Sequence, residues 1–416
     1  MRWSAGGGQL NSPGDPGTGQ AISSVSGERE GPLEDGRPGL SGALPFTVRS
    51  PVKITFWRRV VEAQLAEPAA RESRHRHDVR RFGLVVCVLG ACLAISLLLS
   101  LTVGAARIPI RDTLRFLVGD RSLSASTMTV LREVRLPRVA AAALVGAALS
   151  IAGLLFQGLF RNPLADPYVI GSSGGAALGA AAGFFLLPQV DLLGFGTVSL
   201  AAFAGSVLTI VLVYRLARAG GRTQIVTLLL AGFGVSTMLS YTTYFFELLN
   251  QNYGLGISML VSWFHGTIDV PRWAQLAVSG VMMIAAFSAS IPLARRLNTL
   301  ALGDEYAQQL GLNLESTRMV LIVIGSLLVA SAVSLGGLIS FVGLVVPHLA
   351  RLVMGPDNVR LLPVTAIAGA LFLVVADTLA RTLLAPTEIP VGVLSAFVGG
   401  PFFLYLLRRT KREYRL

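Results

Sequence analysis

VAAAALVGAALSIAGLLFQGLF, at positions 139–160, is a run of apolar and small residues that contains no charged side chain. A helix needs about 20 such residues to cross the hydrocarbon core of a bilayer, so this run predicts one membrane span. Comparable charge-free runs precede and follow it, at positions 82–106, 167–190, 192–214, 223–246 and 273–294. The pattern predicts an all-α integral membrane protein.

The composition agrees with a protein that crosses the bilayer many times. Hydrophobic residues make up 53% of the 416 residues and charged residues only 14%, whereas soluble domains carry about 25% charge. The formal net charge is +12, and arginine supplies nearly all of it. Because cytoplasmic loops and ends of membrane proteins are rich in arginine, we expect the excess there and no binding of nucleic acid.

The C-terminal half adds further spans. The charge-free run 319–347 is too long for one helix, and the sequence SLGG at 334–337 is a natural break into two. Runs at 361–380 and 389–407 complete the set. The segment 248–268 is also charge-free, but NQNYGLG interrupts it, so we expect a loop with a short helix there. The sequence therefore predicts a polytopic bundle of about ten transmembrane helices.

Both chain ends are predicted to lie in the cytoplasm. If the N-terminus is inside and the spans alternate, most loop arginines and the tail RRTKREYR at 408–415 fall on the cytoplasmic side. Two cytoplasmic ends require an even number of spans, which ten satisfies and nine does not. The predicted location is the cytoplasmic (inner) membrane, as a multi-pass protein in contact with membrane lipid.

The first outer loop is an exception to this distribution because it is strongly basic. One interpretation is that the first helix and its N-terminal flank already fix the topology, which leaves the loop free to carry arginines. The other is that the loop meets an acidic partner outside the membrane. The sequence leaves both open. The arginines concerned are Arg107, Arg111, Arg115, Arg121, Arg132, Arg135 and Arg138.

The N-terminal 80 residues differ from the rest of the chain. They are rich in Gly, Pro, Ser and charge, which predicts disorder over much of their length. Residues 56–81 fit an amphipathic helix on the inner membrane face. The sequence HRHD at 75–78 resembles a metal-binding tract, but arginines surround it, and a solvated charge run is the better interpretation. We therefore predict a cytoplasmic extension, 1–80, a membrane domain, 81–416, and no metal site.

A polar stretch, LGDEYAQQLGLNLESTR at 302–318, interrupts the apolar spans. Leu302, Tyr306 and Leu310 recur every four residues, which predicts a short helix, and the glycine that follows fits its end. Asn313 is placed to cap a second helix that leads back to the membrane. We expect small or polar exposed groups. An ordinary interfacial loop is one interpretation, and an element that docks into a groove of a cytoplasmic protein is the other.

No motif for catalysis or nucleotide binding is found. A Walker-type phosphate loop needs a lysine after a glycine pattern, and none of the lysines follows one. His265 and His348 are single and separated, so we expect structural or pore-lining roles. Asp377 is an ionisable residue within a span, and Arg381 four residues on predicts an internal ion pair. The chain is predicted not to be an enzyme and to hold no cofactor. Any ATP would bind a partner.

Several long segments resemble the FecCD-type permeases, the transmembrane subunits of ABC importers for iron–siderophores, haem and cobalamin. The stretch LGDEYAQQLGLN is similar to the cytoplasmic coupling helices of that family. The resemblance covers positions 82 to 407 and leaves the first 80 residues without a counterpart. The matching segments are RLPRVAAAALVGAALSIAGLLFQGLFRNPLADP at 135–167, GLISFVGLVVPHLARLVMGPDNVRLLP at 337–363, ADTLAR at 376–381 and EIPVGVLSAFVGGPFFLYLL at 388–407.

The resemblance implies a set of partners. Two permeases, identical or homologous, enclose the pathway between them, two ATPase subunits bind on the cytoplasmic side, and a substrate-binding protein docks on the other. Arginines that match those which meet acidic residues of the binding protein are Arg135, Arg138 and Arg381. The matching ATPase-coupling residues are Leu302, Gly303, Asp304, Glu305, Ala307, Leu310 and Gly311.

The resemblance also implies a gate and an outer segment of the pathway. The inner gate of the family lies at the start of the fifth helix, which corresponds here to TQIVT at 223–227 and is apolar at its narrow point. The sequence WFHG at 263–266 corresponds to an outer segment that contains a tryptophan, for which packing is the alternative role. The candidates are Thr223, Ile225 and Val226 for the gate and Trp263, His265 and Gly266 for the pathway.

The predicted function is import by alternating access, with the two ATPases driving the gates through the coupling helices. A ferric siderophore is the first choice of cargo, and cobalamin or haem are alternatives. One rival is an ion-coupled secondary transporter, which should show inverted repeats and paired midplane acids. Another is a membrane enzyme, which should show a cluster of titratable groups. Neither signature is clear in the sequence.

Overall fold

The structure is a computed structural model, and it describes residues 78–104, 108–120, 122–219, 222–250 and 254–413. The chain separates into two units, Met1–Glu67 and Pro68–Leu416. All described residues belong to the second unit. The expected N-terminal extension and almost all of its amphipathic segment lie outside the described residues, so both stay predictions.

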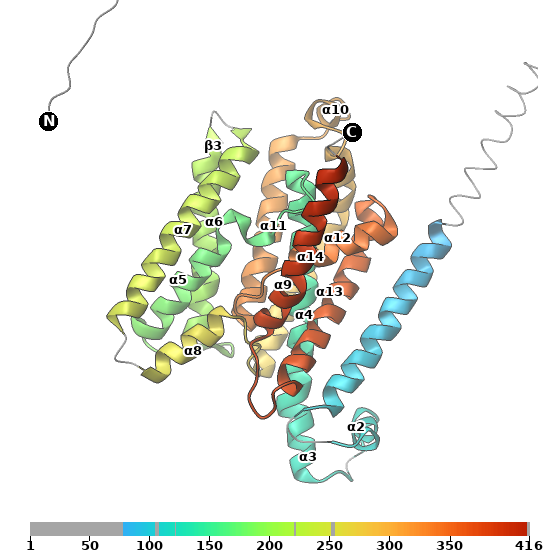
Figure 1. The fold of residues 1–416 in the computed structure, drawn as a ribbon, viewed down its shortest axis with the longest axis vertical. Helices are drawn as coiled ribbons and strands as arrows, with labels where there is room; N and C mark the ends of the chain where they lie inside the picture. The colour runs from blue at the N-terminus through green and yellow to red at the C-terminus, as the bar shows by residue number, and fades with distance from the viewer. Residues whose placement is uncertain (1–77, 105–107, 121, 220–221, 251–253, 414–416) are drawn as a thin grey trace, which may run out of the picture. The chain divides into compact units, whose positions relative to one another are not determined.

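Ten apolar helices form the described part of the chain, as the sequence predicts (Figure 1). Three lie outside the set that is long and apolar enough to span: α5 (Ser172–Phe185), α12 (Val342–Met354) and α14 (Val391–Glu413), whose apolar part is Val391–Leu406. Seven are long and apolar enough to cross a membrane. They are Asp78–Thr102; the continuous helix Ala125–Phe160, made of α3 (Ala125–Thr129), the π-helical turn η1 (Val130–Arg135) and α4 (Leu136–Phe160); α6 (Thr197–Ala217); α7 (Ile225–Leu249); α9 (Trp273–Leu300); α11 (Leu314–Gly336); and α13 (Asn358–Thr382).

Short elements connect these helices. Two antiparallel pairs of two-residue strands form the only strand pairs among the described residues. The short elements are α2 (Ile110–Leu117), the 3₁₀ turn η2 (Pro167–Ile170), β1 (Asp191–Leu192), β2 (Phe195–Gly196), β3 (Arg218–Ala219), β4 (Arg222–Thr223), α8 (Gly254–Phe264) and α10 (Asp304–Gln309).

The interruptions predicted from the sequence are confirmed. The long apolar run divides where α11 ends and α12 begins, and Gly337 adopts a left-handed backbone (φ 66°) at the break. The segment after α7 forms the short helix α8. The run 167–190 is divided unexpectedly, because Gly171 (φ 89°) separates η2 from α5. Glycine adopts this conformation without the steric cost that other residues incur.

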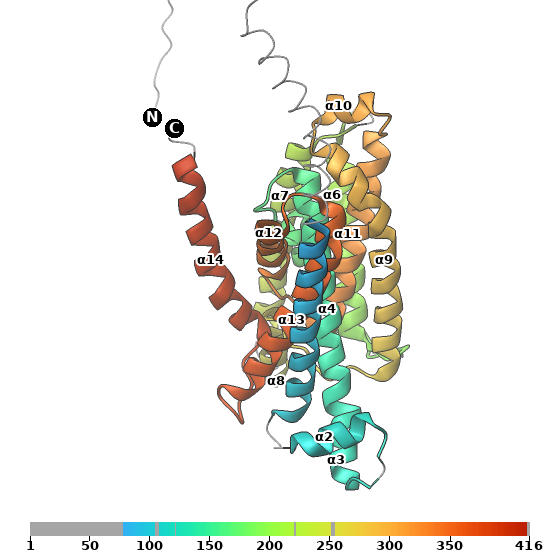
Figure 2. The ribbon, with the colours of Figure 1, turned by 90° about the vertical axis from the view of Figure 1, so that its right-hand side faces the viewer.

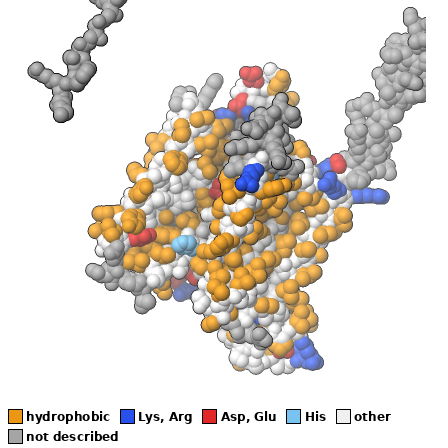
Figure 3. All heavy atoms as spheres, viewed as in Figure 1, with side chains coloured by type: hydrophobic (Ala, Val, Ile, Leu, Met, Phe, Trp, Pro, Cys, Tyr) orange, Lys and Arg blue, Asp and Glu red, His pale blue; other side chains and the backbone are white. Residues whose placement is uncertain are grey.

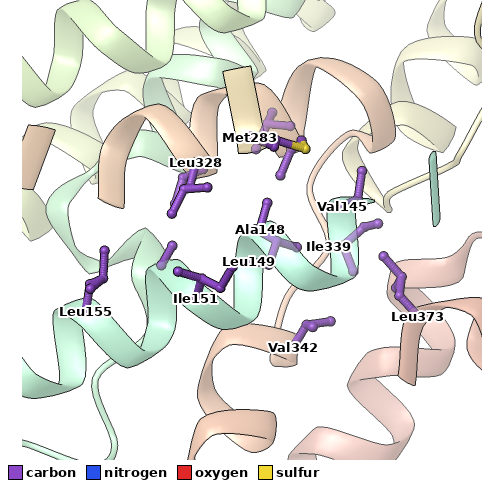
Figure 4. Packing of buried hydrophobic residues seen from close by; sticks show 14 of the residues in the cluster. Val145, Ala148, Leu149, Ile151, Leu155, Met283, Leu328, Ile339, Val342 and Leu373 are labelled. Atoms are coloured by element: carbon purple, nitrogen blue, oxygen red, sulfur yellow. The ribbon is translucent and has the colours of Figure 1, made fainter. Parts of the chain in front are cut away.

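Helix α4 is the centre of the packing. Figure 4 shows its side chains Val145, Ala148, Leu149 and Ile151 among apolar side chains from α9, α11, α12 and α13. Close approach depends on small residues, because a Cβ on Gly153 of α4 would lie 1.8 Å from the carbonyl oxygen of Gly343 in α12. Small residues allow membrane helices to pack backbone to backbone.

The bundle has two ends with different short elements. Helices α2 and α3 lie at one end, hereafter the α3 end, and α10 with the strands β3 and β4 lies at the opposite end, the α10 end (Figures 1 and 2). Helix α4 starts at the α3 end and finishes near the α10 end. Between the ends, the face seen in Figure 3 shows many hydrophobic side chains and few charged ones, as expected for a surface in contact with lipid.

Candidate functional site

The polar stretch at the α10 end folds as a helix, a glycine turn and a second helix, which confirms the prediction. Gly303 (φ 110°) and Gly311 (φ 82°) bound α10 on its two sides. The side chain of Asn313 accepts a hydrogen bond from the backbone N–H of Ser316 at 3.0 Å and so caps α11. Satisfying an otherwise unpaired N–H in this way fixes where the helix begins.

The exposed face of α10 is more apolar than expected. The sequence predicts small or polar exposed groups, but Leu302, Tyr306 and Leu310 are exposed by 60%, 64% and 67%. Only Ala307 of α10 is buried, against the body of the bundle. An exposed stripe of large apolar side chains at one end of a protein is typical of a contact surface. Its partner stays a prediction.

Asp304 joins α10 to two neighbouring segments. Its Oδ2 lies 2.5 Å from Nη2 of Arg318 in α11, and its Oδ1 accepts a hydrogen bond from Arg161, directly after α4. Partial burial opposes ionisation of the carboxyl, but the hydrogen bonds and positive charges of the two arginines outweigh it and hold the pKa of Asp304 below its usual value. The first turn of α10 is therefore anchored by charge-assisted hydrogen bonds.

A second set of contacts fastens Thr223, the last residue of β4. The carboxylate of Glu315 accepts hydrogen bonds from the backbone N–H of Thr223 at 2.9 Å and from its hydroxyl at 2.6 Å. It also accepts one from the Tyr214 hydroxyl at 3.1 Å. Nη1 of Arg318 donates to the carbonyl oxygen of Thr223 at 3.2 Å. We call Thr223, Glu315 and Arg318 the Thr223 clamp.

The candidate gate residues are Thr223, which belongs to this clamp, and two residues that follow it closely in the chain. Thr223 is buried, α7 begins at Ile225, and Val226 is exposed. The structure thus brings together two candidate sites that are far apart in sequence, the coupling segment and the gate segment. Sequence reasoning missed Glu315 and Arg318 as the side chains that join them. The roles of the gate and of the coupling residues stay predictions.

A hydroxyl-rich face of α7 also escaped the sequence analysis. It lines a hollow of about 430 Å³. The Thr237 hydroxyl donates to the carbonyl oxygen of Phe233 at 2.8 Å, whereas lipid offers no partner to the hydroxyls of Tyr241 and Tyr244, so this face suits contact with water, a ligand or another protein surface. The spacing of these residues on one helix face was the available signal. The lining residues are Phe233, Ser236, Thr237, Ser240, Tyr241 and Tyr244.

At the α3 end, the predicted ion pair within α13 is confirmed and is part of a larger cluster. Nε of Arg381 lies 3.0 Å from Oδ2 of Asp377, which is fully buried. Nε of Arg138, at the start of α4, lies 3.1 Å from the other oxygen, Oδ1. Nη1 and Nη2 of Arg138 contact the two carboxylate oxygens of Glu388 at 3.2 and 2.8 Å. We call Arg138, Asp377, Arg381 and Glu388 the arginine cluster.

The three candidate docking arginines are buried and bonded within the chain. Nη1 of Arg135 donates to the carbonyl oxygen of Leu101 at 2.5 Å, and Nη2 of Arg381 donates to the Ser100 hydroxyl at 2.6 Å. Arg135 and Arg381 thereby connect η1 and α13 to the end of the helix Asp78–Thr102. A docking role for these arginines stays a prediction. The sequence predicted the contact of Arg381 with Asp377 but not the internal contacts of Arg135 and Arg138.

The candidate pathway residues occupy different environments. Trp263 is buried, in edge-to-face contact with Phe264 at 5.9 Å between ring centroids. The buried Gly266 (φ 73°) packs on Leu338, whereas His265 is exposed. Burial agrees with the packing alternative for Trp263, and the pathway role of the three stays a prediction. Among the described residues, no three His, Cys, Asp or Glu side chains gather as a metal site.

Comparison with known proteins finds extensive similarity. A sequence profile of the FecCD transport family matches residues 92–409. The cobalamin import system permease protein of Halobacterium salinarum is 43% identical over 290 residues, which cover 70% of this chain and 76% of the relative. The hemin transport system permease protein of Yersinia pestis is 38% identical, covering 68% of this chain and 84% of the relative.

A solved structure is similar as well. It is described as an inward-facing conformation of an ABC transporter of the metal-chelate type. It matches with a TM-score of 0.67 and 29% sequence identity, over 79% of this chain and 99% of the other. The similarity therefore extends to the arrangement of the helices.

Proposed function

Because the chain belongs to the FecCD transport family, we propose that it is the membrane subunit of an importer that carries a bulky metal chelate and is driven by a separate ATPase. One observation carries this proposal. The arginine side chain that holds α10 through Asp304 also holds the segment before α7 through the Thr223 carbonyl. A displacement of α10 can therefore be transmitted through Arg318 to Thr223, directly before the start of α7.

The surface of α10 supports an ATPase as the partner at this end. Leu302, Tyr306 and Leu310 form an exposed apolar stripe, while Ala307 packs inward. A short anchored helix that presents Tyr306, with the exposed Leu302 before it and Leu310 after it, suits insertion into a groove of another protein. We place this end in the cytoplasm, which also places both chain termini there and the protein in the cytoplasmic (inner) membrane.

The hydroxyl face of α7 supports a second permease copy. Tyr241 and Tyr244 are exposed on this single chain, and lipid would leave their hydroxyls unsatisfied. If two copies face each other, these groups line a shared pathway, gated at Thr223, Ile225 and Val226. A substrate-binding protein docks at the α3 end, where Arg135, Arg138 and Arg381 lie.

The cargo is proposed to be a ferric siderophore, with cobalamin as the second candidate. The charge-free pathway face of α7 suits a bulky chelate that must bind weakly and move on. Similarity to a cobalamin permease at 43% identity favours the second candidate specifically. Haem is a third, through the hemin permease of Yersinia pestis.

Reconstitution tests this function. The permease is placed in liposomes with the ATPase and the binding protein encoded beside it, and ATP-dependent uptake of labelled ferric siderophore, cobalamin and haem is measured in parallel. Tyr306→Asp should abolish ATPase binding and uptake, because it puts a charge into the apolar stripe. Gln308→Asp, on a polar part of the same helix, is the matched control.

The result separates the proposal from its main rival. Uptake of one cargo that needs both ATP and Tyr306 supports the importer. Uptake that follows an ion gradient without any ATPase would instead establish a secondary transporter. Turnover of a compound by the purified chain alone would establish an enzyme.

A further inference from the structure

We propose that Glu388 occupies, within the free permease, the place that a carboxylate of the docking protein takes on Arg138, so that docking requires Glu388 to leave. This inference rests on the proposed function, because it assumes an extracytoplasmic partner at the α3 end. Glu388 would thus set how strongly an acidic partner binds. No sequence motif indicates this role.

The geometry leaves Arg138 no free edge. Its Nε faces Asp377 at 3.1 Å, and its two terminal nitrogens face both oxygens of Glu388 at 3.2 and 2.8 Å. This is the two-point arrangement in which a guanidinium binds a carboxylate most strongly. A second carboxylate cannot reach the same edge while Glu388 is there.

Charge balance explains why a carboxylate must occupy that edge. Arg138 and Arg381 share the single fully buried carboxylate of Asp377. Asp269 also lies close enough to interact with the charge of Arg138, but it forms no ion pair with it among the described residues. Apart from Glu388, the two guanidiniums therefore have one carboxylate in direct contact between them. An unbalanced charge in a poorly solvated site is costly. Glu388 supplies the missing negative charge, and a partner's Asp or Glu would supply the same charge in its place.

Exposure identifies Glu388 as the group that can leave. The side chain of Arg138 is 10% exposed and that of Asp377 is 0%, whereas the side chain of Glu388 is 47% exposed. Glu388 lies in the connection between α13 and α14, outside both helices. Its carboxylate can therefore move into solvent without exposing the buried pair, while a partner arriving from solvent meets Glu388 before it meets Arg138.

Arg381 offers no equivalent exchange. Arg381 is held by Asp377 and by the Ser100 hydroxyl at 2.6 Å, and both of these groups are buried. Arg135 donates to the buried Leu101 carbonyl. Among the described contacts of these three arginines, the Arg138–Glu388 contact is the one with a half-exposed carboxylate. The geometry therefore points to an acidic side chain as the partner group at this position.

Affinity measurements test the exchange. The full-length permease, in lipid nanodiscs with its ATPase, is titrated with the purified substrate-binding protein encoded beside it, at low and high salt. Glu388→Gln should tighten the Kd about three- to tenfold at low salt, because removing a half-exposed competing charge has a modest effect that salt screens. Glu388→Asp, whose shorter side chain reaches Arg138 less well, should fall between Gln and wild type. Arg138→Gln should weaken binding.

A matched control is Glu133→Gln, because Glu133 is an exposed carboxylate at the same end that pairs with Arg132 at 3.5 Å. It should leave the Kd unchanged. Weaker binding by Glu388→Gln would overturn the proposal and show that Glu388 itself contacts the partner. Unchanged binding by Glu388→Gln, with weaker binding by Arg138→Gln, would overturn it while keeping the docking site. No effect of either variant, with uptake intact, would place docking elsewhere and reject that part of the proposed function.

Discussion

Arg318 contacts two segments that lie far apart in the sequence: its Nη2 is 2.5 Å from Oδ2 of Asp304, and its Nη1 is 3.2 Å from the carbonyl oxygen of Thr223. Because a guanidinium is planar and rigid, the two contacts cannot be adjusted independently. A displacement of Asp304 is therefore passed to Thr223 or breaks one of the two bonds.

Removing this side chain should uncouple ATP hydrolysis from transport. In Arg318→Ala, we expect uptake to fall at least about tenfold, a loss equivalent to one to two hydrogen bonds to a charged group, while ATP hydrolysis persists. Arg318→Lys should recover part of the uptake. The control is Arg296→Ala, an exposed arginine in α9. Equal loss of hydrolysis and uptake would show a defect of assembly instead.

The charge of Asp304 should make the stability of the α10 end depend on pH. Its folded pKa lies below the usual value, so its stabilising effect is complete above the ordinary aspartate pKa of about 3.9 and is lost as the pH falls through the lowered folded value. Asp304→Asn should thus lower the melting temperature at pH 7, and the difference should shrink below pH of about 4. The control is Gln308→Ala, which changes an exposed uncharged residue of the same helix.

The stability of the protein should depend on the balance of positive and negative charges in the arginine cluster. Asp377→Asn leaves Arg381 without its carboxylate, while Arg138 keeps Glu388, and breaking a buried pair by removing one partner costs about 3–5 kcal/mol. We expect a clear fall in melting temperature in detergent. Adding Arg381→Leu removes one of the two positive charges and should restore part of the loss. A double variant as unstable as the sum of the single variants would contradict a shared charge balance.

The glycine contact between α4 and α12 should tolerate no side chain. Gly153→Ala places a methyl group 1.8 Å from the Gly343 carbonyl oxygen, so the helices must separate. Overpacking of this kind costs about 1–3 kcal/mol or more. Gly90→Ala is the control, because nothing lies within 4 Å of the added methyl and alanine favours a helix. Equal melting temperatures for the two variants would refute the close contact.

Local signals predicted much of the fold. The apolar runs predicted about nine or ten helices, and the described chain has seven long enough to cross a membrane together with shorter apolar ones. SLGG predicted the break between α11 and α12, and Asn313 predicted the cap of α11. The four-residue spacing of Asp377 and Arg381 gave their ion pair. Each of these features depends on residues close together in the sequence. Composition and periodicity were therefore sufficient to predict them.

The long-range contacts were beyond such signals. Arg138 and Glu388 are 250 positions apart, and Thr223 and Glu315 are 92 apart, so no helical or strand period relates them. The apolar exposure of Tyr306 was also missed, because periodicity identifies a stripe but not whether it faces the bundle or solvent. Pairing across a bundle depends on which helices lie side by side, and that is a property of the whole chain.

Helix α4 carries an arginine contact at each extremity: Arg138 near its first residue and Arg161 directly after its last. Its 25 residues form a helix about 37 Å long. A hydrogen-bonded helix of this kind keeps its length when one end is displaced. A shift imposed at one extremity is hence a shift of the other. For the proposed partners, thermodynamic reciprocity then has a definite consequence: if the nucleotide state of the ATPase changes the affinity for the docking protein by some factor, docking changes the nucleotide affinity by the same factor.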